Sequence, residues 1–61
     1  MKSSELLRIL KRAGWYEKRQ KGSHIIMIHP IKEGILVVPD HGSAEVAKGL
    51  EKDILKKAGL N

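Results

Sequence analysis

Only two residues, Gly22 and Ser23, separate two extended segments of the chain, residues 15–21 and 24–29. A connection this short joins antiparallel neighbours, since parallel strands need a much longer crossover. Glycine at the first central position favours a type II′ turn. The spacing therefore predicts a β-hairpin in the first half of the chain.

The register of this hairpin places three polar side chains on one face. Lys21 and His24 flank the turn, so they are predicted to form a cross-strand pair. Arg19 lies two residues before Lys21 and shares its face, because side chains alternate along a strand.

The second strand of the hairpin is almost entirely apolar. Ile25 and Met27 point to one face, and Ile26 and Ile28 point to the other. A third apolar run, residues 35–38, predicts another strand that is stopped by the following proline. Helices on one face of such a small sheet would leave one apolar pair uncovered. That surface would either contact a protein partner or be covered by flanking loops, and the sequence favours neither.

Amphipathic patterns predict a helix at each end of the chain. The first runs from about residue 4 to residue 13, with Ser3 or Ser4 as its N-cap. The second is marked by apolar residues at helical spacing between residues 50 and 58. A glycine follows each pattern and can cap it. Residues 40–48 are expected to be a loop or an irregular helix start.

The predicted order is helix, strand, strand, strand, helix, which is an α+β fold. Short connections make the strands an antiparallel three-stranded sheet, with both helices packed on one face. This is the topology of a double-stranded-RNA-binding domain, and it raises the expectation of an RNA function without establishing one. The 61 residues are expected to form a single domain, 1–61.

Composition and charge limit the kinds of site, the cell compartment and the partners expected for this domain. The chain has no cysteine, so no disulfide or thiolate metal site is expected. No apolar run is long enough to span a membrane, and the start lacks a signal-peptide pattern, so we expect a cytoplasmic protein. Lys and Arg number 12 against 7 Asp and Glu, which gives a net charge of +5. That charge suits nucleic acid and an acidic protein partner equally well.

Three histidines are the first candidates for chemistry. His24 and His29 lie five residues apart on one strand and therefore point to opposite faces. Together with His41 they offer no compact ligand spacing, so the sequence predicts no metal and no cofactor. Ser23 and His24 are adjacent, which sends their side chains apart and disfavours a Ser-His-Asp triad.

His24 has a better setting for catalysis, directly after a tight turn with Lys21 opposite and Arg19 nearby. An imidazole can take or give a proton near neutral pH, and cations can hold a phosphate. RNA cleavage without a metal needs this combination, with a base for the 2′-hydroxyl proton and positive charge at the phosphate. Judged from the spacing alone, however, a histidine at this position is more often an exposed turn residue than a catalyst.

Four segments carry a further pattern: Lys21-Gly22-Ser23-His24, His29-Pro30, Val38-Pro39 and Ile54-Leu55-Lys56-Lys57-Ala58-Gly59-Leu60. They resemble the HicA toxins of bacterial HicA–HicB toxin–antitoxin pairs, and the resemblance extends over essentially the whole chain. It implies a double-stranded-RNA-binding-like fold and mRNA interferase activity. It also implies that the histidine of Gly-Ser-His, here His24, is catalytic. A HicB-like antitoxin would mask this site and would alone contact operator DNA.

The chain departs from that family at two places. Many members carry a second histidine directly after the first, and here the residue is Ile25. The second helix often opens Gly-Thr-Leu, and here it reads Gly49-Leu50-Glu51. This loses a possible threonine N-cap, which would stabilise the helix by about 1 kcal/mol. The isoleucine at position 25 would matter only if catalysis needed two adjacent imidazoles. The change at the start of the second helix affects the stability of the fold and not the chemistry.

Three hypotheses follow. The favoured one is a toxin endoribonuclease in which His24 transfers the proton, Lys21 and Arg19 hold the phosphate, and Ser23 positions His24 or the RNA. The second is a non-catalytic RNA-binding module of the same fold, but residues 49–53 at the start of the last helix are charge-balanced rather than basic. The third is a protein-interaction module without an RNA role, suggested by the apolar strand faces.

Overall fold

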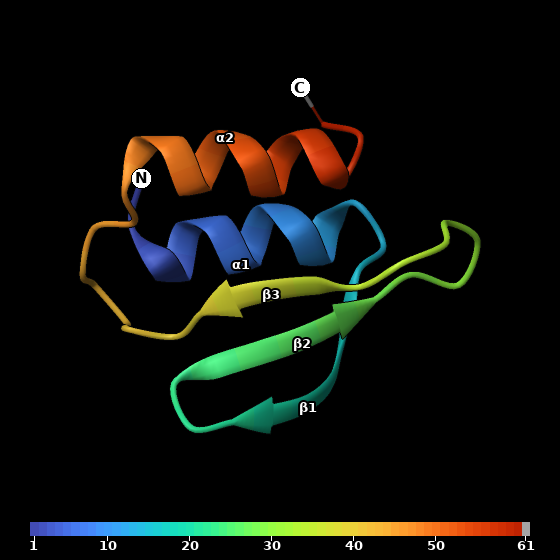
Figure 1. Ribbon diagram of the computed structural model, residues 1–61, viewed down its shortest axis with the longest axis horizontal. Coiled ribbons are helices and arrows are strands. Elements are labelled where there is room, and N and C mark those ends of the chain that lie inside the picture. Colours follow the sequence, from blue (N-terminus) through green and yellow to red (C-terminus); the bar gives the residue numbers. More distant parts are fainter. Residues whose placement is uncertain (61) are drawn as a thin grey trace.

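The computed structural model describes residues 1–60. Its elements follow the order predicted from the sequence, two helices enclosing three strands (Figure 1): α1 Ser3–Arg12, β1 Tyr16–Lys21, β2 His24–Ile28, β3 Leu36–Pro39 and α2 Lys48–Lys57. The strands form one antiparallel sheet in the order β1-β2-β3. The α+β fold class is confirmed.

The β1–β2 hairpin has the predicted register and turn. Lys21 pairs with His24, so the loop contains only Gly22 and Ser23. Gly22 has a φ of +61°, and within residues 1–60 no residue other than glycine has a positive φ. A type I′ turn would need positive φ at both loop positions, so the turn is type II′. The register shifts between Glu17 and Arg19, where an extra residue increases the local twist of β1.

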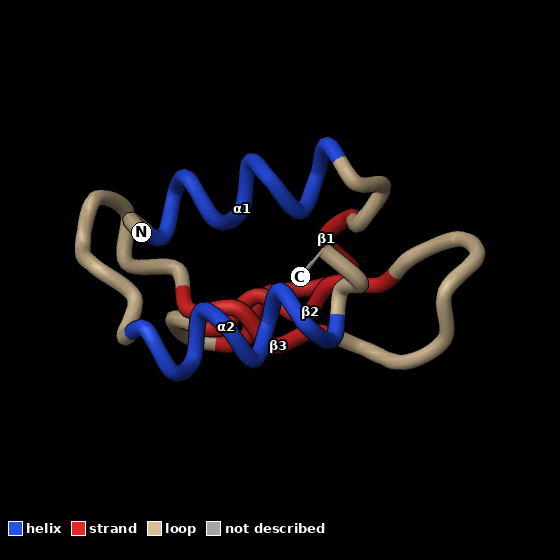
Figure 2. The backbone as a smooth tube through the Cα atoms, turned by 90° about the horizontal axis from the view of Figure 1, so that it is seen from above, coloured by secondary structure: helices blue, strands red, loops and turns tan. Residues whose placement is uncertain are grey.

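One face of the sheet forms the floor of the hydrophobic core. Ile25 pairs with Val38, and Met27 pairs with Leu36, and all four side chains are buried. Both helices cover this face, as predicted, and Figure 2 shows α1 as a layer separate from the strands. The remaining core side chains come from the helices and the segments beside them: Leu6, Leu10, Trp15, Val46, Ile54 and Ala58. Burying one large apolar side chain of this kind stabilises the fold by about 1.5–3 kcal/mol.

The expected serine N-cap of the first helix is wrong. Lys2 occupies the N-cap position, without a side-chain capping bond. Ser3 is completely buried, and its hydroxyl donates to the carbonyl of Pro39. The same oxygen accepts the N–H of His41 at 3.3 Å. The hydroxyl therefore ties α1 to the end of β3. It is not needed as a cap, because the backbone N–H groups of Ser3 and Ser4 donate to the carbonyls of Ala44 and Gly42, each at 3.0 Å.

The second helix begins earlier than the comparison with a family threonine N-cap at position 50 assumed. Residues 40–47 lie outside helices and strands, and α2 starts at Lys48 with Ala47 as its N-cap. Gly49 and Leu50 lie inside the first turn. The position compared with a family threonine is therefore not the N-cap, and the predicted loss of a cap there is wrong.

The third strand is shifted by one residue from the predicted 35–38, since it begins at Leu36 and includes Pro39 as its last residue. A proline is tolerated there because β3 is an edge strand and its missing N–H breaks no ladder between two strands. The loop of residues 29–35 between β2 and β3 projects from one end of the molecule (Figures 1 and 2). Within residues 1–60, neither helix has the length and apolarity needed to cross a bilayer.

Candidate functional site

His24 opens β2 directly after the hairpin turn and is exposed. It pairs with Lys21 of β1 on one side and with Pro39 of β3 on the other. Residues paired across a strand share a face, and the neighbouring Ile25 points into the core. His24 therefore lies on the sheet face that the helices leave uncovered.

Two cations lie on the same face as His24. Lys21 is its direct partner, which places the two Cβ atoms about 4.5–5.5 Å apart. Arg19 pairs with Ile26, so it is a diagonal neighbour of His24 at about 7–8 Å. Among residues 1–60 neither Arg19 nor Lys21 takes part in an ion pair. The shared face is the one that the hairpin register predicted, and among the described residues neither charge is neutralised by an ion pair there.

Side chains from two distant segments hold the turn in place. The Gln20 amide donates to the Gly22 carbonyl at 3.0 Å and to the Asp40 carboxylate at 3.2 Å. The backbone N–H of Asp40 donates to the Ser23 carbonyl at 2.7 Å. These bonds fix the start of β2, and with it the backbone that carries His24. Sequence reasoning missed Gln20 and Asp40, because no local pattern links residues 20 positions apart.

Ser23 is exposed in the turn, and within residues 1–60 its side chain makes no hydrogen bond. Its backbone carbonyl is the acceptor for Asp40. Ser23 therefore sits beside His24 with a hydroxyl open to solvent. Its predicted role in positioning His24 or the RNA stays a prediction.

The other two histidines lie in the loops that follow β2 and β3. The Nδ1 atom of His29 accepts the backbone N–H groups of Ile31 and Lys32, at 3.0 and 3.1 Å. Since Nδ1 is an acceptor, Nε2 carries the proton and donates to the Ala13 carbonyl at 3.0 Å. His41 is exposed in the loop after β3. Within residues 1–60, no three histidine or acidic side chains converge in the manner of metal ligands.

Apolar side chains surround His24 on the uncovered face. Ile26 and Ile28 are half-buried, while Val37 and Tyr16 are 45% and 48% exposed. Of the two alternatives for this face, the flanking loops do not bury it. The face combines an apolar surface with two free cations and an imidazole, which suits contact with a partner that carries negative charge.

The arrangement of His24, Lys21 and Arg19 is suited to proton transfer beside a phosphate. An imidazole can accept a proton from a hydroxyl, and a lysine and an arginine beside it can stabilise negative charge on a phosphate. The turn that carries the imidazole is held by hydrogen bonds to Asp40, directly after β3, so the backbone at His24 is fixed relative to β3. Together the three groups can support attack of a hydroxyl on a phosphodiester.

Comparisons with known proteins agree with this reading. The family model described as HicA toxin of bacterial toxin–antitoxin systems matches residues 3–60. The chain is 42% identical over 60 residues to a probable mRNA interferase HicA of Pseudomonas fluorescens (strain Pf0-1), which covers 98% of this chain and 97% of that protein. It is also similar to a chain in a solved HicA3 and HicB3 toxin–antitoxin complex. There the TM-score is 0.77 at 31% identity, over 100% of this chain and 97% of that one.

Proposed function

The chain belongs to the HicA family of bacterial toxins, and we propose that it is an endoribonuclease that cleaves mRNA and uses His24 for proton transfer. The support in the fold is the alignment of His24, Lys21 and Arg19 on the sheet face that no helix covers. A relative at 42% identity bears the name of an mRNA interferase. The whole of residues 1–61 would act as one catalytic domain in the cytoplasm, where mRNA is translated.

In the proposed reaction the 2′-hydroxyl of one nucleotide attacks the adjacent phosphate. His24 takes the hydroxyl proton as the bond from O2′ to phosphorus forms and the bond to the 5′-oxygen breaks. The leaving oxygen receives a proton from water, and the products carry a 2′,3′-cyclic phosphate and a 5′-hydroxyl. Lys21 and Arg19 stabilise the charge that develops on the phosphate oxygens, which is the larger part of catalysis in many such sites.

This mechanism needs no metal, since the two cations supply the positive charge. Within it, Ser23 would contact His24 or the RNA backbone through its open hydroxyl. We therefore propose that cleavage continues when EDTA removes divalent ions. Loss of cleavage in EDTA, restored by Mg²⁺ or another divalent ion, would contradict the metal-independent mechanism.

We also propose that a HicB-like antitoxin covers the face around His24. The solved relative at 31% identity is described as part of a toxin–antitoxin complex. The half-buried Ile26 and Ile28 and the exposed Val37 offer apolar contact area there, and Arg19 and Lys21 offer charge for acidic side chains. An antitoxin bound in this way would block RNA access, and only the antitoxin would contact operator DNA.

The decisive experiment compares His24→Ala with His41→Ala. Both histidines are exposed, so neither change should alter the free energy of unfolding by more than about 0.5 kcal/mol. Loss of a residue that transfers the proton lowers the cleavage rate by about 10²- to 10⁴-fold. We expect His24→Ala to lose RNA cleavage and growth arrest, and His41→Ala to keep both.

Equal activity of the two variants would remove His24 from the mechanism. Intact RNA with wild-type protein, together with salt-dependent RNA binding, would instead favour a non-catalytic RNA-binding module. Circular dichroism of each variant confirms that the comparison is between folded proteins.

A further inference from the structure

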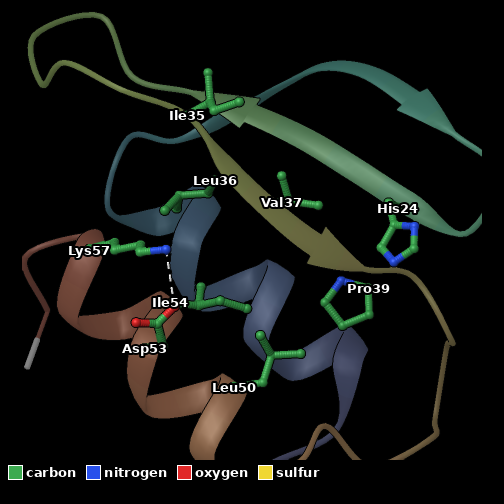
Figure 3. A pocket seen from close by; sticks show the side chains of 9 residues that line it. All are labelled: His24, Ile35, Leu36, Val37, Pro39, Leu50, Asp53, Ile54 and Lys57. Atoms are coloured by element: carbon green, nitrogen blue, oxygen red, sulfur yellow. Dashed lines mark ion pairs between the residues drawn. The ribbon is translucent and has the colours of Figure 1, made fainter.

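A pocket of about 410 Å³ lies between β3 and α2, and His24 forms part of its wall. Figure 3 shows His24 beside Pro39 at one end of this groove, with Leu50 reaching toward the same space from α2. The buried side chains of Leu36 and Ile54 lie at its base. The groove is therefore apolar on both sides and continuous with the proposed catalytic residue.

A polar pair marks the other end of the groove. Asp53 and Lys57, one turn apart on α2, form an ion pair of 3.1 Å. Both side chains are more than half exposed, at 54% and 63%. The groove thus presents a hydrogen-bond acceptor and a donor side by side, at the end away from His24.

We propose that this groove holds the nucleobase next to the scissile phosphate, and that Asp53 and Lys57 read its edge. The proposal rests on the proposed function, because His24 places the reacting phosphate at the mouth of the groove. A nucleobase has apolar faces and a polar edge that carries both donors and acceptors. Its faces would lie against Leu50 and the β3 side chains, and its edge would meet the ion pair.

The size and polarity of the groove favour a base over a protein side chain. Its volume is near the lower end of the roughly 300–1,000 Å³ found for small-ligand pockets, which suits one ring system. An apolar anchor residue of a protein would displace water at the exposed Asp53–Lys57 pair without offering the hydrogen bonds that the water made, which loses affinity. A base replaces those bonds. Single-stranded RNA is also read in this way by proteins, through bases turned out from the strand.

Two readouts test the proposal, and the first does not depend on catalysis. Nucleoside 3′-monophosphates are titrated into the wild-type protein, and the methyl resonances of Leu36, Leu50 and Ile54 are followed by NMR. Binding in the groove should shift these methyls. Leu50→Trp fills the groove and should abolish the shifts, whereas Ile31→Trp, on a loop side chain that is 86% exposed, should keep them.

The second readout is the base preference of cleavage on an RNA of mixed sequence. Asp53→Asn converts an acceptor into a group that can also donate, and it breaks the ion pair with Lys57. The ratio of cleavage rates between the best and second-best base should change by roughly 5- to 150-fold, the range for one base-edge contact. The matched control is Glu17→Gln, which removes the ion pair of 3.0 Å with Lys11, outside the groove.

The outcomes separate this proposal from the proposed function. If the wild type cleaves RNA, His24→Ala does not, and Asp53→Asn and Glu17→Gln share the wild-type base preference, the groove does not read the base. The same conclusion follows if Leu50→Trp weakens binding of the antitoxin alone, since the groove then holds a protein side chain. Absence of methyl shifts with every nucleotide also overturns the proposal, even where cleavage by His24 is intact.

Discussion

His29 shows how one side chain can hold two loops together. Its ring bonds the backbone of Ala13 before β1 and the backbone of Ile31 and Lys32 after β2. The ring also lies edge-on to Trp15, with ring centroids 5.2 Å apart. Gly14 fits beside it only because it lacks a Cβ, which would lie 2.7 Å from Nε2, and its φ of +102° excludes most other residues. The histidine of the His-Pro motif is thus a structural residue in this fold.

We expect His29→Ala to destabilise the fold by about 2 kcal/mol. Three hydrogen bonds are lost, each contributing about 0.5–1.5 kcal/mol, although water can replace some of them. Urea unfolding followed by circular dichroism measures the change. Under conditions where the variant is folded it should still cleave RNA, because His29 lies outside the His24 group. A variant as stable as the wild type, or one that is folded but inactive, would contradict this assignment.

At the scale of the elements, the two helices begin without side-chain caps. Lys2 and Ala47 occupy the N-cap positions, and neither makes a side-chain bond to the first turn. The last turn of each helix carries two basic residues, whose charge complements the helix dipole. They are Lys11 and Arg12 in α1 and Lys56 and Lys57 in α2. Packing therefore does more than the helix ends to hold α2, through Ile54 and Ala58.

Ala47→Ser should stabilise the protein by about 1 kcal/mol, because the serine hydroxyl can accept one of the free N–H groups of the first turn. Ala47 has an extended backbone, with φ −56° and ψ 139°, and is exposed, so a hydroxyl is accommodated. Ala44→Ser, in the loop before α2, is the matched control and should change the free energy of unfolding by less than about 0.5 kcal/mol. Equal effects of the two substitutions in urea unfolding would argue against a capping contribution.

At the scale of the whole molecule, the first residues connect α1 to the segment before α2. The Met1 amino group forms ion pairs of 2.9 Å with Glu45 and 2.8 Å with Glu51. The Met1 carbonyl accepts the Val46 N–H at 3.0 Å. Lys2 and Glu45 form an isolated β-bridge, so contacts separated by more than 40 residues close this end of the fold.

The same ion pairs predict a pH dependence of stability. Hydrogen bonding to Glu51 and then to Glu45 raises the pKa of the Met1 amino group above its ordinary value of 8.0. Hydrogen bonding from that amino group lowers the pKa of Glu45 below its ordinary value of 4.5. The amino group therefore contributes fully below pH 8.0 and loses its effect as pH rises through the raised pKa. Glu45 contributes above pH 4.5 and loses its effect as pH falls through the lowered pKa.

A chemically synthesised chain with an acetylated amino terminus tests this prediction. The unmodified chain should be more stable than the acetylated one between about pH 4.5 and pH 8.0, and the difference should shrink on both sides of that window. Urea unfolding of both chains across pH measures the difference. A difference that does not vary with pH would contradict the contribution of these ion pairs.

The sequence alone determined the order of the elements and the register of the hairpin. Both depend on local chemistry, namely a two-residue turn that starts with glycine, alternating side chains and apolar residues at helical spacing. For the same reason it placed His24, Lys21 and Arg19 on one face, and this alignment is the basis of the proposed site. The roles of these residues stay predictions, since geometry places groups without measuring a rate.

Only the tertiary structure decided what lies around that face. Ser3 reads as a helix cap, but its hydroxyl bonds the carbonyl of Pro39, 36 residues away. Gln20 and Asp40 fix the turn, and the α2 residues Leu50 and Asp53 form a groove with His24. The local periodicity of the sequence does not reveal such pairs, because they form only when distant segments pack over a shared core. The chain thus encodes its strands and helices locally, and the surroundings of the site through packing.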